Sequence, residues 1–404
     1  MNKHLKVLGD GQIWDVKGIL PQASGKTFED LFSGRALAQM AKEFNQQPSK
    51  GKRIFSAFKE KGKITGLSVT KALLSNDKRA KETARILLED LAKNAARGIA
   101  VLNAGKGFKE NWSNRERNYW RNLDFIIIGG GVSEGLTGRI LVSLIKKYLS
   151  QDELSDIKVS QAKFPGKEAG FLGAVINIIR QICNEAKIKS LKVISAIGLD
   201  LGREEIGAGL LAINPRLARI LKQKKHYWLF KYAVKTPYKN YLKNFVDARR
   251  DYTISERRLG ERIRCAILEQ MADLIIRAQN KTRKIGLPCA QNVGVAVPGS
   301  TSYDGYIINS TDYLPFFRKE DGFNFAKNLE ESLIKSGMRN YRIHIINDGI
   351  AAGIANIYFD PSTSLRVNSE RSRTIDLSKL RRGKCAFLGA GSGLGGCVGV
   401  INTI

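Results

Sequence analysis

The feature that most constrains the fold lies near the C-terminus, where residues 385–401 read CAFLGAGSGLGGCVGVI. An apolar strand leads into a glycine-rich turn, and a second apolar strand follows it. From Gly389 to Gly396, six of the eight residues are glycine or alanine, and Ser392 is the only hydroxyl. Consecutive backbone N–H groups without Cβ atoms can cradle a phosphate, although such a cluster also forms tight turns and bulges. By itself the segment favours neither interpretation.

Three further segments, at 124–135, 198–211 and 294–315, are of the same kind: each is an apolar strand that ends in glycine. Strands alternate with amphipathic helices along the chain, which is typical of the α/β class. Residues 190–202 and 206–214 are expected to pair as a hairpin. The remaining strands are expected at 124–130, 292–299 and 342–348, and helices at 31–44, 78–104, 140–149 and 325–337.

The composition limits the class of protein. With 404 residues the chain is long enough for two domains. No apolar run approaches the roughly 20 residues that cross a bilayer, and the N-terminus lacks the apolar core of a signal peptide. The five cysteines are scattered without CxxC spacing, so we expect small buried side chains in a reducing compartment, with neither zinc nor disulfides. These features favour a cytoplasmic protein without a membrane partner.

The net charge of +29 is concentrated most densely around residues 216–264, where aromatic side chains alternate with Lys and Arg. Nucleic-acid-binding surfaces have such a composition. A solvated helical hairpin, with its aromatic residues in the core and its lysines in water, explains the segment equally simply and is the favoured interpretation. Nonspecific binding of polyanions at low salt is expected in either case.

Seven segments together resemble one family, the ROK family of sugar kinases and sugar-responsive repressors. They are DLGREEIGAGLL, VGVAVPG, IINDGIAAG, GAGSGLGG, FEDLFSGRAL, IIIGGGVS and KEAGFLGAVI. The resemblance implies the two-lobed, actin-like sugar-kinase fold of the ribonuclease H-like class, with a nucleotide and a sugar held between the lobes. It covers most of the chain, apart from insertions near 106–120, 225–256 and 361–383.

The order of these motifs is unusual for the family, because the segment that normally comes first stands here at 200–202. Residues 1–187 resemble the family's C-terminal half and residues 188–404 its N-terminal half, so the order is circularly permuted. Domain termini often lie close together at the surface, which makes such a permutation physically acceptable. We therefore expect the two chain ends to form neighbouring strands. A piece of a tandem array of such domains is the rival interpretation.

The resemblance also implies roles for individual residues. Asp348 occupies the position of the catalytic base, although an Asp at a helix start also serves as an N-cap. Asn347 and Glu29 match residues that contact the sugar, and a first-turn carboxylate is the plainer interpretation of Glu29. Gly299 and Tyr313 lie in further sugar-side motifs.

On the nucleotide side, the resemblance implies ATP and Mg²⁺ as cofactors. Asp200 matches the acidic residue that orients Mg²⁺ through water. The phosphate and adenosine contacts would come from glycine-rich turns, at Gly202, Gly389, Gly391, Ser392, Gly393, Gly129, Gly130, Gly131 and Ser133.

Several departures from the family pattern leave two functions open. Arg203-Glu204-Glu205 replaces the Gly-Thr-Lys of the kinases, Tyr313 replaces an Asn, and the family's zinc loop with its histidine is absent. The first function is phosphorylation of a hydroxyl on a hexose or amino sugar by ATP. The second is a non-catalytic sugar-sensing or interaction module related to the repressors, and a homodimer is compatible with both. The retained Asp348, Asn347 and Glu29 favour the kinase.

Overall fold

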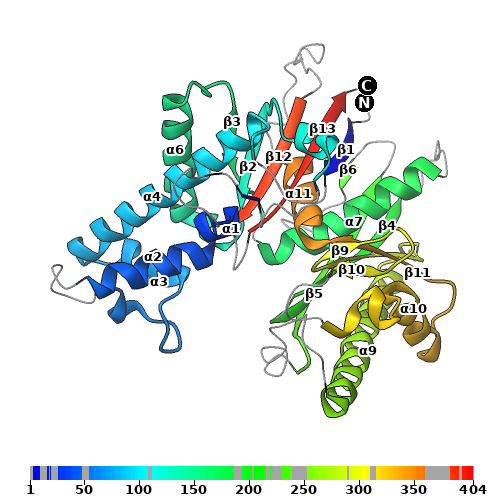
Figure 1. Ribbon diagram of the computed structural model, residues 1–404. Helices are drawn as coiled ribbons and strands as arrows, with labels where there is room; N and C mark the ends of the chain where they lie inside the picture. Colours follow the sequence, from blue (N-terminus) through cyan, green and yellow to red (C-terminus); the bar gives the residue numbers. More distant parts are fainter. Residues whose placement is uncertain are drawn as a thin grey trace. The chain divides into compact units, whose positions relative to one another are not determined.

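The fold is described from a computed structural model of the chain. The description covers residues 3–9, 16–17, 19, 26–47, 54–107, 112–164, 166–185, 193–202, 204–214, 219–220, 229–238, 253–288, 291–309, 315–359, 383–390 and 394–403. The chain divides into two compact units. Unit 1 comprises Met1–Gly166 and Asn356–Ile404, and unit 2 comprises Lys167–Ala355. Both units are of mixed α/β type (Figure 1).

Unit 1 contains the N-terminal helices and a mixed sheet. Its elements are β1 (Lys3–Gly9), α1 (Phe28–Leu31), α2 (Gly34–Gln46), η2 (Ile54–Phe58), α3 (Gly66–Leu74), α4 (Lys78–Asn103), α5 (Asn114–Tyr119), β2 (Phe125–Gly129), η3 (Gly131–Ser133), α6 (Gly135–Gln151), β3 (Lys158–Gln161), β12 (Gly383–Ala390) and β13 (Leu394–Thr403).

The five-stranded sheet of unit 1 joins the two ends of the sequence. Its strand order is β1-β13-β12-β2-β3. β12 and β13 form an antiparallel hairpin around the glycine-rich turn, and β12 runs parallel to β2. β1 pairs antiparallel with β13, so that Leu5 lies opposite Ile401 (Figure 1). The expectation that the two ends lie on neighbouring strands is confirmed, and the permuted order of the family motifs stays an interpretation.

The core of unit 1 lies between this sheet and its helices. Helix α4 begins at the N-cap Asp77, whose carboxylate accepts the Ala80 N–H at 3.0 Å, and its apolar face is buried. α2, α3, α4 and α6 pack with the side chains of Ile126 and Ile128 on β2 and with those of Ala386 and Leu388 on β12. The hydrophobic burial of these helices therefore fixes the strand ends that carry the glycine turns.

Unit 2 contains a second, mixed sheet with helices on both faces. Its elements are α7 (Gly166–Glu185), β4 (Ile194–Leu201), β5 (Glu205–Asn214), β6 (Arg219–Ile220), β7 (Phe230–Lys235), α9 (Ile254–Lys284), β8 (Asn292–Val297), β9 (Ser300–Thr301), β10 (Ile307–Asn309), η4 (Pro315–Phe317), η5 (Lys319–Asp321), α10 (Phe325–Lys335), β11 (Arg342–Asn347) and α11 (Asp348–Phe359).

The unit 2 sheet has the order β11-β8-β4-β5-β6, and β7 also pairs with β5. β11, β8 and β4 are parallel, whereas β4 and β5 form the antiparallel hairpin expected from the sequence. Alternate side chains of β4 face opposite layers. Ile197 and Leu199 pack in the core with α9 and α10, and Gly198 lies against Phe171 of α7.

Three sequence expectations are changed by the structure. The expected domain boundary at 187/188 differs from the division found, because β12 and β13 complete the sheet of unit 1 and α7 packs on the sheet of unit 2. The helical hairpin favoured for 216–264 is wrong over 230–235, where β7 adds a strand to β5 through backbone hydrogen bonds. Cys385 and Cys397 are buried as expected, but Cys265 is exposed, because it lies on the outward face of α9.

The described helices include none that is long and apolar enough to cross a membrane. The insertion at 361–383 lies, except for the first residue of β12, outside the described residues. Within the described parts, the expected strands at 124–130, 292–299 and 342–348 correspond to β2, β8 and β11, and the expected helices at 78–104, 140–149 and 325–337 correspond to α4, α6 and α10.

Candidate functional site

The strongest cluster of chemically useful groups lies where β11 ends and α11 begins. Asn347 closes the strand and Asp348 opens the helix. The Asn347 amide Nδ2 donates to the Gly299 carbonyl at 2.9 Å and to Asp348 Oδ1 at 3.2 Å. Asp348 Oδ1 also accepts the Gly349 N–H at 2.8 Å. These bonds hold the Asp348 carboxylate at the carboxyl end of a parallel strand, where ligands bind in α/β sheets.

The capping role that Asp348 could have filled belongs to Asn347. The Asn347 Oδ1 accepts the backbone N–H of Ile350, three residues on, at 3.0 Å, which is the N-cap bond of α11. Gly299 has φ +94°, a backbone conformation that favours glycine. Its carbonyl accepts the hydrogen bond from the Asn347 amide. Asp348 is therefore available for chemistry, while the amide of the buried Asn347 is engaged inside the protein. The expected contact of Asn347 with a sugar stays a prediction.

A second carboxylate, that of Asp200, shares the site. Asp200 lies next to the end of β4, and burial raises the pKa of its side chain well above the ordinary value, with a further contribution from the charge of Asp348. Burial raises the pKa of Asp348 to about 6, against the lowering effect of its bonds to backbone N–H groups. A Cβ atom added at Gly170 of α7 would lie 2.6 Å from Asp200 Cγ, so the backbone of α7 passes directly over this carboxylate.

The turn that follows Asp200 is held from the neighbouring strand. The Gly202 N–H donates to the Glu205 carbonyl at 3.1 Å and closes the β4–β5 turn. Thr236, directly after β7, binds the other side of this turn: its hydroxyl donates to the Gly202 carbonyl at 2.7 Å and its N–H to the Glu204 carbonyl at 3.1 Å. The carbonyls of Gly202 and Glu204 thus both bind Thr236. Arg203, at the tip, lies outside the described residues.

In unit 1 the two expected glycine turns are brought together by the sheet. β12 and β2 are parallel neighbours, and Gly389 lies directly opposite Gly129. Gly130 has φ +83°, and an added Cβ would lie 2.4 Å from the backbone carbon of Ala390. The turns at 129–131 and 389–390 therefore touch backbone to backbone. Gly391, Ser392 and Gly393 lie outside the described residues.

A cavity of about 410 Å³ opens at the carboxyl ends of β2 and β3 in unit 1. Ser133 does not offer its hydroxyl to this cavity, because the buried Ser133 Oγ donates to the Gly130 carbonyl at 2.8 Å. The Gln161 amide joins β3 to the turn by donating to the carbonyls of Ser133 and Gly135 at 2.6 and 3.1 Å. The cavity is lined by Gly130, Ser133, Glu134, Gly135, Arg139, Gln161, Ala162, Lys163 and Phe164.

A substitution pair tests how tightly these turns are packed. Gly130→Ala is expected to destabilise the protein by about 1–3 kcal/mol, because its Cβ would overlap the Ala390 backbone in a positive-φ conformation. Gly131→Ala is the matched control, since an added Cβ there meets no atom within 4 Å. Urea denaturation of both variants measures the difference, and equal stabilities would contradict the packing described.

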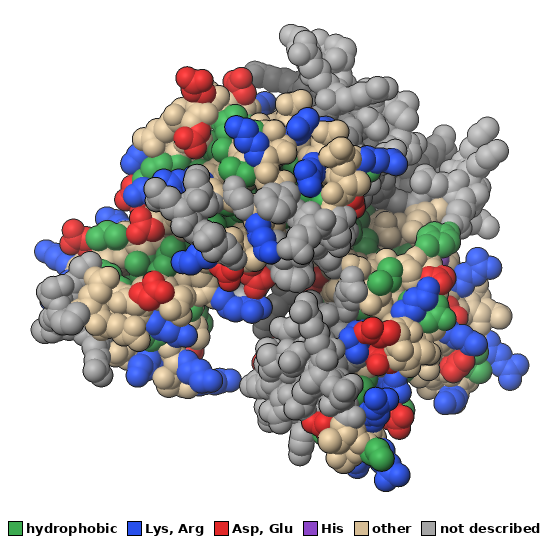
Figure 2. Space-filling model, viewed as in Figure 1, with side chains coloured by type: hydrophobic (Ala, Val, Ile, Leu, Met, Phe, Trp, Pro, Cys, Tyr) green, Lys and Arg blue, Asp and Glu red, His purple; other side chains and the backbone are tan. Residues whose placement is uncertain are grey.

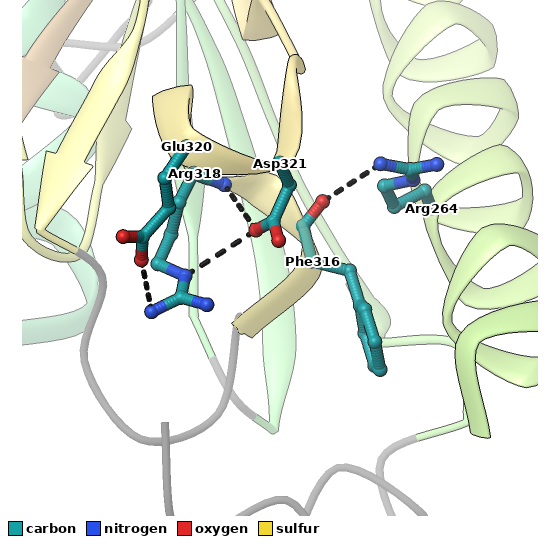
Figure 3. A network of polar contacts seen from close by, with 5 residues as sticks. All are labelled: Arg264, Phe316, Arg318, Glu320 and Asp321. Atoms are coloured by element: carbon teal, nitrogen blue, oxygen red, sulfur yellow. Dashed lines mark hydrogen bonds and ion pairs between the residues drawn. The ribbon is translucent and has the colours of Figure 1, made fainter. Parts of the chain in front are cut away.

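Glu29 and Tyr313 are two further residues that the family resemblance places near the sugar. Glu29 of α1 lies in unit 1, where its carboxylate pairs with Arg35 at 3.1 Å beside the capping box of Thr27 and Asp30. Tyr313 lies outside the described residues. The segment just after it is anchored to α9, because Arg264 donates to the Phe316 carbonyl at 2.9 Å (Figure 3).

The adjoining turn, η5, is closed by its own side chains. Arg318 contacts Asp321 at 3.3 Å and also pairs with Glu320 (Figure 3). The segment that follows Tyr313 is therefore held by α9 and by its own side chains.

The carboxylate pair fits a hydrated cation better than a cation bound only by protein. In the described ranges, no group of three or more His, Cys, Asp or Glu side chains could hold a metal ion. Asp200 and Asp348 interact electrostatically, and no basic side chain of the described chain forms an ion pair with either. Mg²⁺ usually keeps several waters and takes one or two carboxylates together with phosphate oxygens. Two neighbouring carboxyl groups without a described basic partner could supply such ligands in their ionised form.

Some residues of the site were not found by sequence reasoning. Thr236 and Gln161 act through hydrogen bonds to backbone groups distant in sequence, and no local pattern signals such bonds. Gly170 lies in a segment that the family resemblance marked, but its contact with Asp200 depends on how α7 packs. On the face shown in Figure 2, the described Lys and Arg side chains are scattered among acidic side chains.

Comparison with known proteins gives limited information. No family model matches the chain, and no curated protein matches it. Among solved structures, the chain is similar to the ROK hexokinase from Thermus thermophilus, with 20% sequence identity and a TM-score of 0.26. The match covers 51% of this chain and 46% of that chain, so it spans less than half of the hexokinase. A TM-score this low does not define a shared fold, and the function must be inferred from the residues themselves.

Proposed function

We propose that the protein is a sugar kinase that transfers a phosphoryl group from ATP to a hydroxyl of a hexose or amino sugar. The observation that carries the proposal is the Asp348 carboxylate, which is fixed by two hydrogen bonds, is free of the capping role and has a pKa raised to about 6. A general base is most effective when its pKa lies near the working pH.

Asp348 would accept the proton of the attacking hydroxyl. An alcohol is a poor nucleophile, and phosphoryl transfer depends on positioning and on charge stabilisation. Asn347 would keep the carboxylate oriented through its amide, while Gly299 fixes Asn347. Burial would keep competing water from the base, as transfer to a sugar rather than to water requires.

The nucleotide is assigned to the glycine turns of unit 1. The contact of Gly130 with Ala390 and the cavity beside Gly130 and Ser133 support a site for adenosine and phosphates there. Asp200 is the residue that would orient Mg²⁺ through water, and the ion would neutralise phosphate charge. These roles for the glycine turns and for Asp200 come from the family resemblance.

The pH dependence of turnover follows from the protonation of Asp348. Because only the carboxylate form of Asp348 accepts a proton, kcat/KM for the sugar is expected to rise about tenfold per pH unit below pH 6 and to level off above about pH 7. The pH profile with saturating ATP and Mg²⁺ measures this. A profile that is flat between pH 5 and 7 would contradict Asp348 as the base.

A thermal-shift screen tests the proposed ligands without assuming turnover. ATP with Mg²⁺ and the cognate hexose or amino sugar should each raise the melting temperature, because a ligand that binds only the folded state stabilises it. A shift with sugar alone, without ATP binding or sugar phosphate, would favour the alternative of a sugar-sensing module. The observation that favours the sugar-sensing module is the acidic Glu204-Glu205 pair in the β4–β5 turn.

A further inference from the structure

The cavity at the carboxyl ends of β2 and β3 lies entirely within unit 1, and side-chain amides hold two segments of its lining. The Gln161 amide binds the turn at 133–135. The buried Asn356 of α11 accepts the N–H groups of Lys163 and Phe164 at 2.9 and 3.0 Å. Both segments are therefore fixed before a ligand arrives, which lowers the entropy that is lost on binding.

Glu134 is an acidic side chain in the lining of this cavity. It occupies the N-cap position of α6, but its carboxylate makes no capping hydrogen bond. Instead, Glu134 Oε1 accepts the Gly166 N–H at 3.4 Å, which is long for a hydrogen bond and therefore weak. Arg139 lines the same cavity, yet within the described residues neither Glu134 nor Arg139 forms an ion pair. Most of the accepting capacity of the Glu134 carboxylate is thus available to a ligand.

The backbone on either side of Glu134 leaves room for that ligand. A Cβ atom added at Gly131 or at Gly135 would meet no atom within 4 Å. The cavity volume of about 410 Å³ falls in the usual range of small-molecule sites, roughly 300–1,000 Å³. Phe164 adds an aromatic side chain to the lining, as is common in such sites. A ligand of the size of a nucleoside can therefore lie beside the Glu134 carboxylate.

The chemistry of a carboxylate limits what Glu134 can bind. An ionised Glu only accepts hydrogen bonds, so it attracts hydroxyl groups and repels the phosphates of a nucleotide. The ribose of a nucleotide presents two neighbouring hydroxyl groups, and the two oxygens of one carboxylate can accept from both. In dinucleotide-binding α/β folds, an acidic side chain binds a ribose hydroxyl in this way. Glu134 therefore fits the ribose of a nucleotide better than its phosphates.

We propose that Glu134 binds the ribose hydroxyls of the nucleotide and makes the protein selective for ribonucleotides over deoxyribonucleotides. The inference rests on the proposed function, which assigns the nucleotide to unit 1, and it involves residues of unit 1 only. Hydrogen bonds to an ionised acceptor are roughly twice as strong as neutral ones, so the contact contributes measurably to affinity. Asn356 is a positioning residue, because it holds the backbone of the lining and not the ligand.

Glu134→Gln keeps the size of the side chain and removes its charge. Calorimetry with Mg²⁺ measures the binding of ATP and of its 2′-deoxy and 3′-deoxy analogues to the full chain. The unaltered protein should bind ATP roughly tenfold or more tightly than at least one analogue, because a hydrogen bond to a charged acceptor is lost. In Glu134→Gln the dissociation constant for ATP should rise by a similar factor, and the discrimination against the analogue should largely disappear. The melting temperature without ligand should stay close to that of the unaltered protein.

The sign of the change separates this contact from general electrostatics. Removing a negative charge near a polyphosphate strengthens binding through the electrostatic potential, whereas removing a ribose contact weakens it. Glu82→Gln is the matched control, because it removes an exposed carboxylate of α4 in the same unit, and it should change neither affinity nor discrimination. Tighter ATP binding in Glu134→Gln, or equal discrimination in Glu134→Gln and Glu82→Gln, would overturn the inference.

The outcomes also separate this inference from the proposed function. Sugar phosphorylation, combined with discrimination that persists in Glu134→Gln, would overturn the role of Glu134 and leave the kinase intact. Discrimination that depends on Glu134, without formation of any sugar phosphate, would support Glu134 and overturn the kinase. If the unaltered protein binds no ATP with Mg²⁺, both are overturned.

Discussion

Replacing Asp348 with Asn is expected to lower the rate of sugar phosphorylation by roughly 10²–10⁴-fold, the usual effect of losing a general base. The amide keeps the size of the side chain and can still accept the Gly349 N–H, but it cannot accept the proton of the hydroxyl. The loss should appear in kcat rather than in the dissociation constants of sugar and ATP. Steady-state kinetics and calorimetry on the same preparation measure both quantities.

The pH dependence of the stability of Asp348→Asn provides an independent test. The pKa of Asp348 is raised to about 6 in the folded protein from an ordinary value of 3.8. The stability contributed by its neutral form is therefore fully present below about pH 4 and is lost as the pH rises through 6, by up to about 3 kcal/mol. Asp348→Asn should match the unaltered protein within about 1–2 kcal/mol at pH 4 and become the more stable of the two at pH 8.

Asp348→Ala distinguishes the base from a structural role. Because Asn347 already caps α11, Asp348→Ala should lose turnover as severely as Asp348→Asn and keep most of its stability. Normal turnover in Asp348→Asn, combined with a large loss of stability in Asp348→Ala, would show instead that Asp348 serves the helix.

The largest loss of stability is expected for Gly173→Ala. Gly173 lies on α7, and an added Cβ would lie 1.7 Å from the carbonyl oxygen of Ala351 on α11. The added Cβ has a fixed position on the α7 backbone and the oxygen belongs to the α11 backbone, so the overlap can be relieved only if the helices separate. Ala174, Ala296 and Ala351 form a small buried cluster at this place, and separation would open it. We expect destabilisation of about 3 kcal/mol or more in urea denaturation.

Gly166→Ala is the control on the same helix. An added Cβ at Gly166 meets nothing within 4 Å, and alanine is favoured over glycine in helices, so this variant should be as stable as the unaltered protein or slightly more stable. If Gly173→Ala were equally harmless, α7 and α11 would not be in backbone contact.

The sequence predicted those parts of the fold whose signal is local. The hairpin of β4 and β5 and the long amphipathic helix α4 each correspond to an element that the structure contains. The pairing of β1 with β13 was also predicted, from the permuted order of the family motifs.

What could not be predicted depends on contacts between distant segments. The sequence indicated Asp348 either as a base or as a cap, and only the bond from Ile350 to Asn347 assigns the cap to Asn347. β7 was missed because its charges and aromatic residues suit an amphipathic hairpin as well as an exposed edge strand. Its strand conformation comes from hydrogen bonds to β5, which no periodicity within residues 230–235 specifies.

The most direct test of the kinase is the formation of a sugar phosphate by the purified protein. The protein is incubated with ATP, Mg²⁺ and a panel of hexoses and amino sugars, and phosphorus NMR follows both the nucleotide and the product, with Asp348→Asn as the parallel control. At least one sugar should give a sugar phosphate in equal amount to the ADP formed, at a rate lowered in the control by the factor expected for a lost base. ATP left intact with every sugar, or ADP formed equally by both proteins, would contradict the assignment of Asp348 as the base of a sugar kinase.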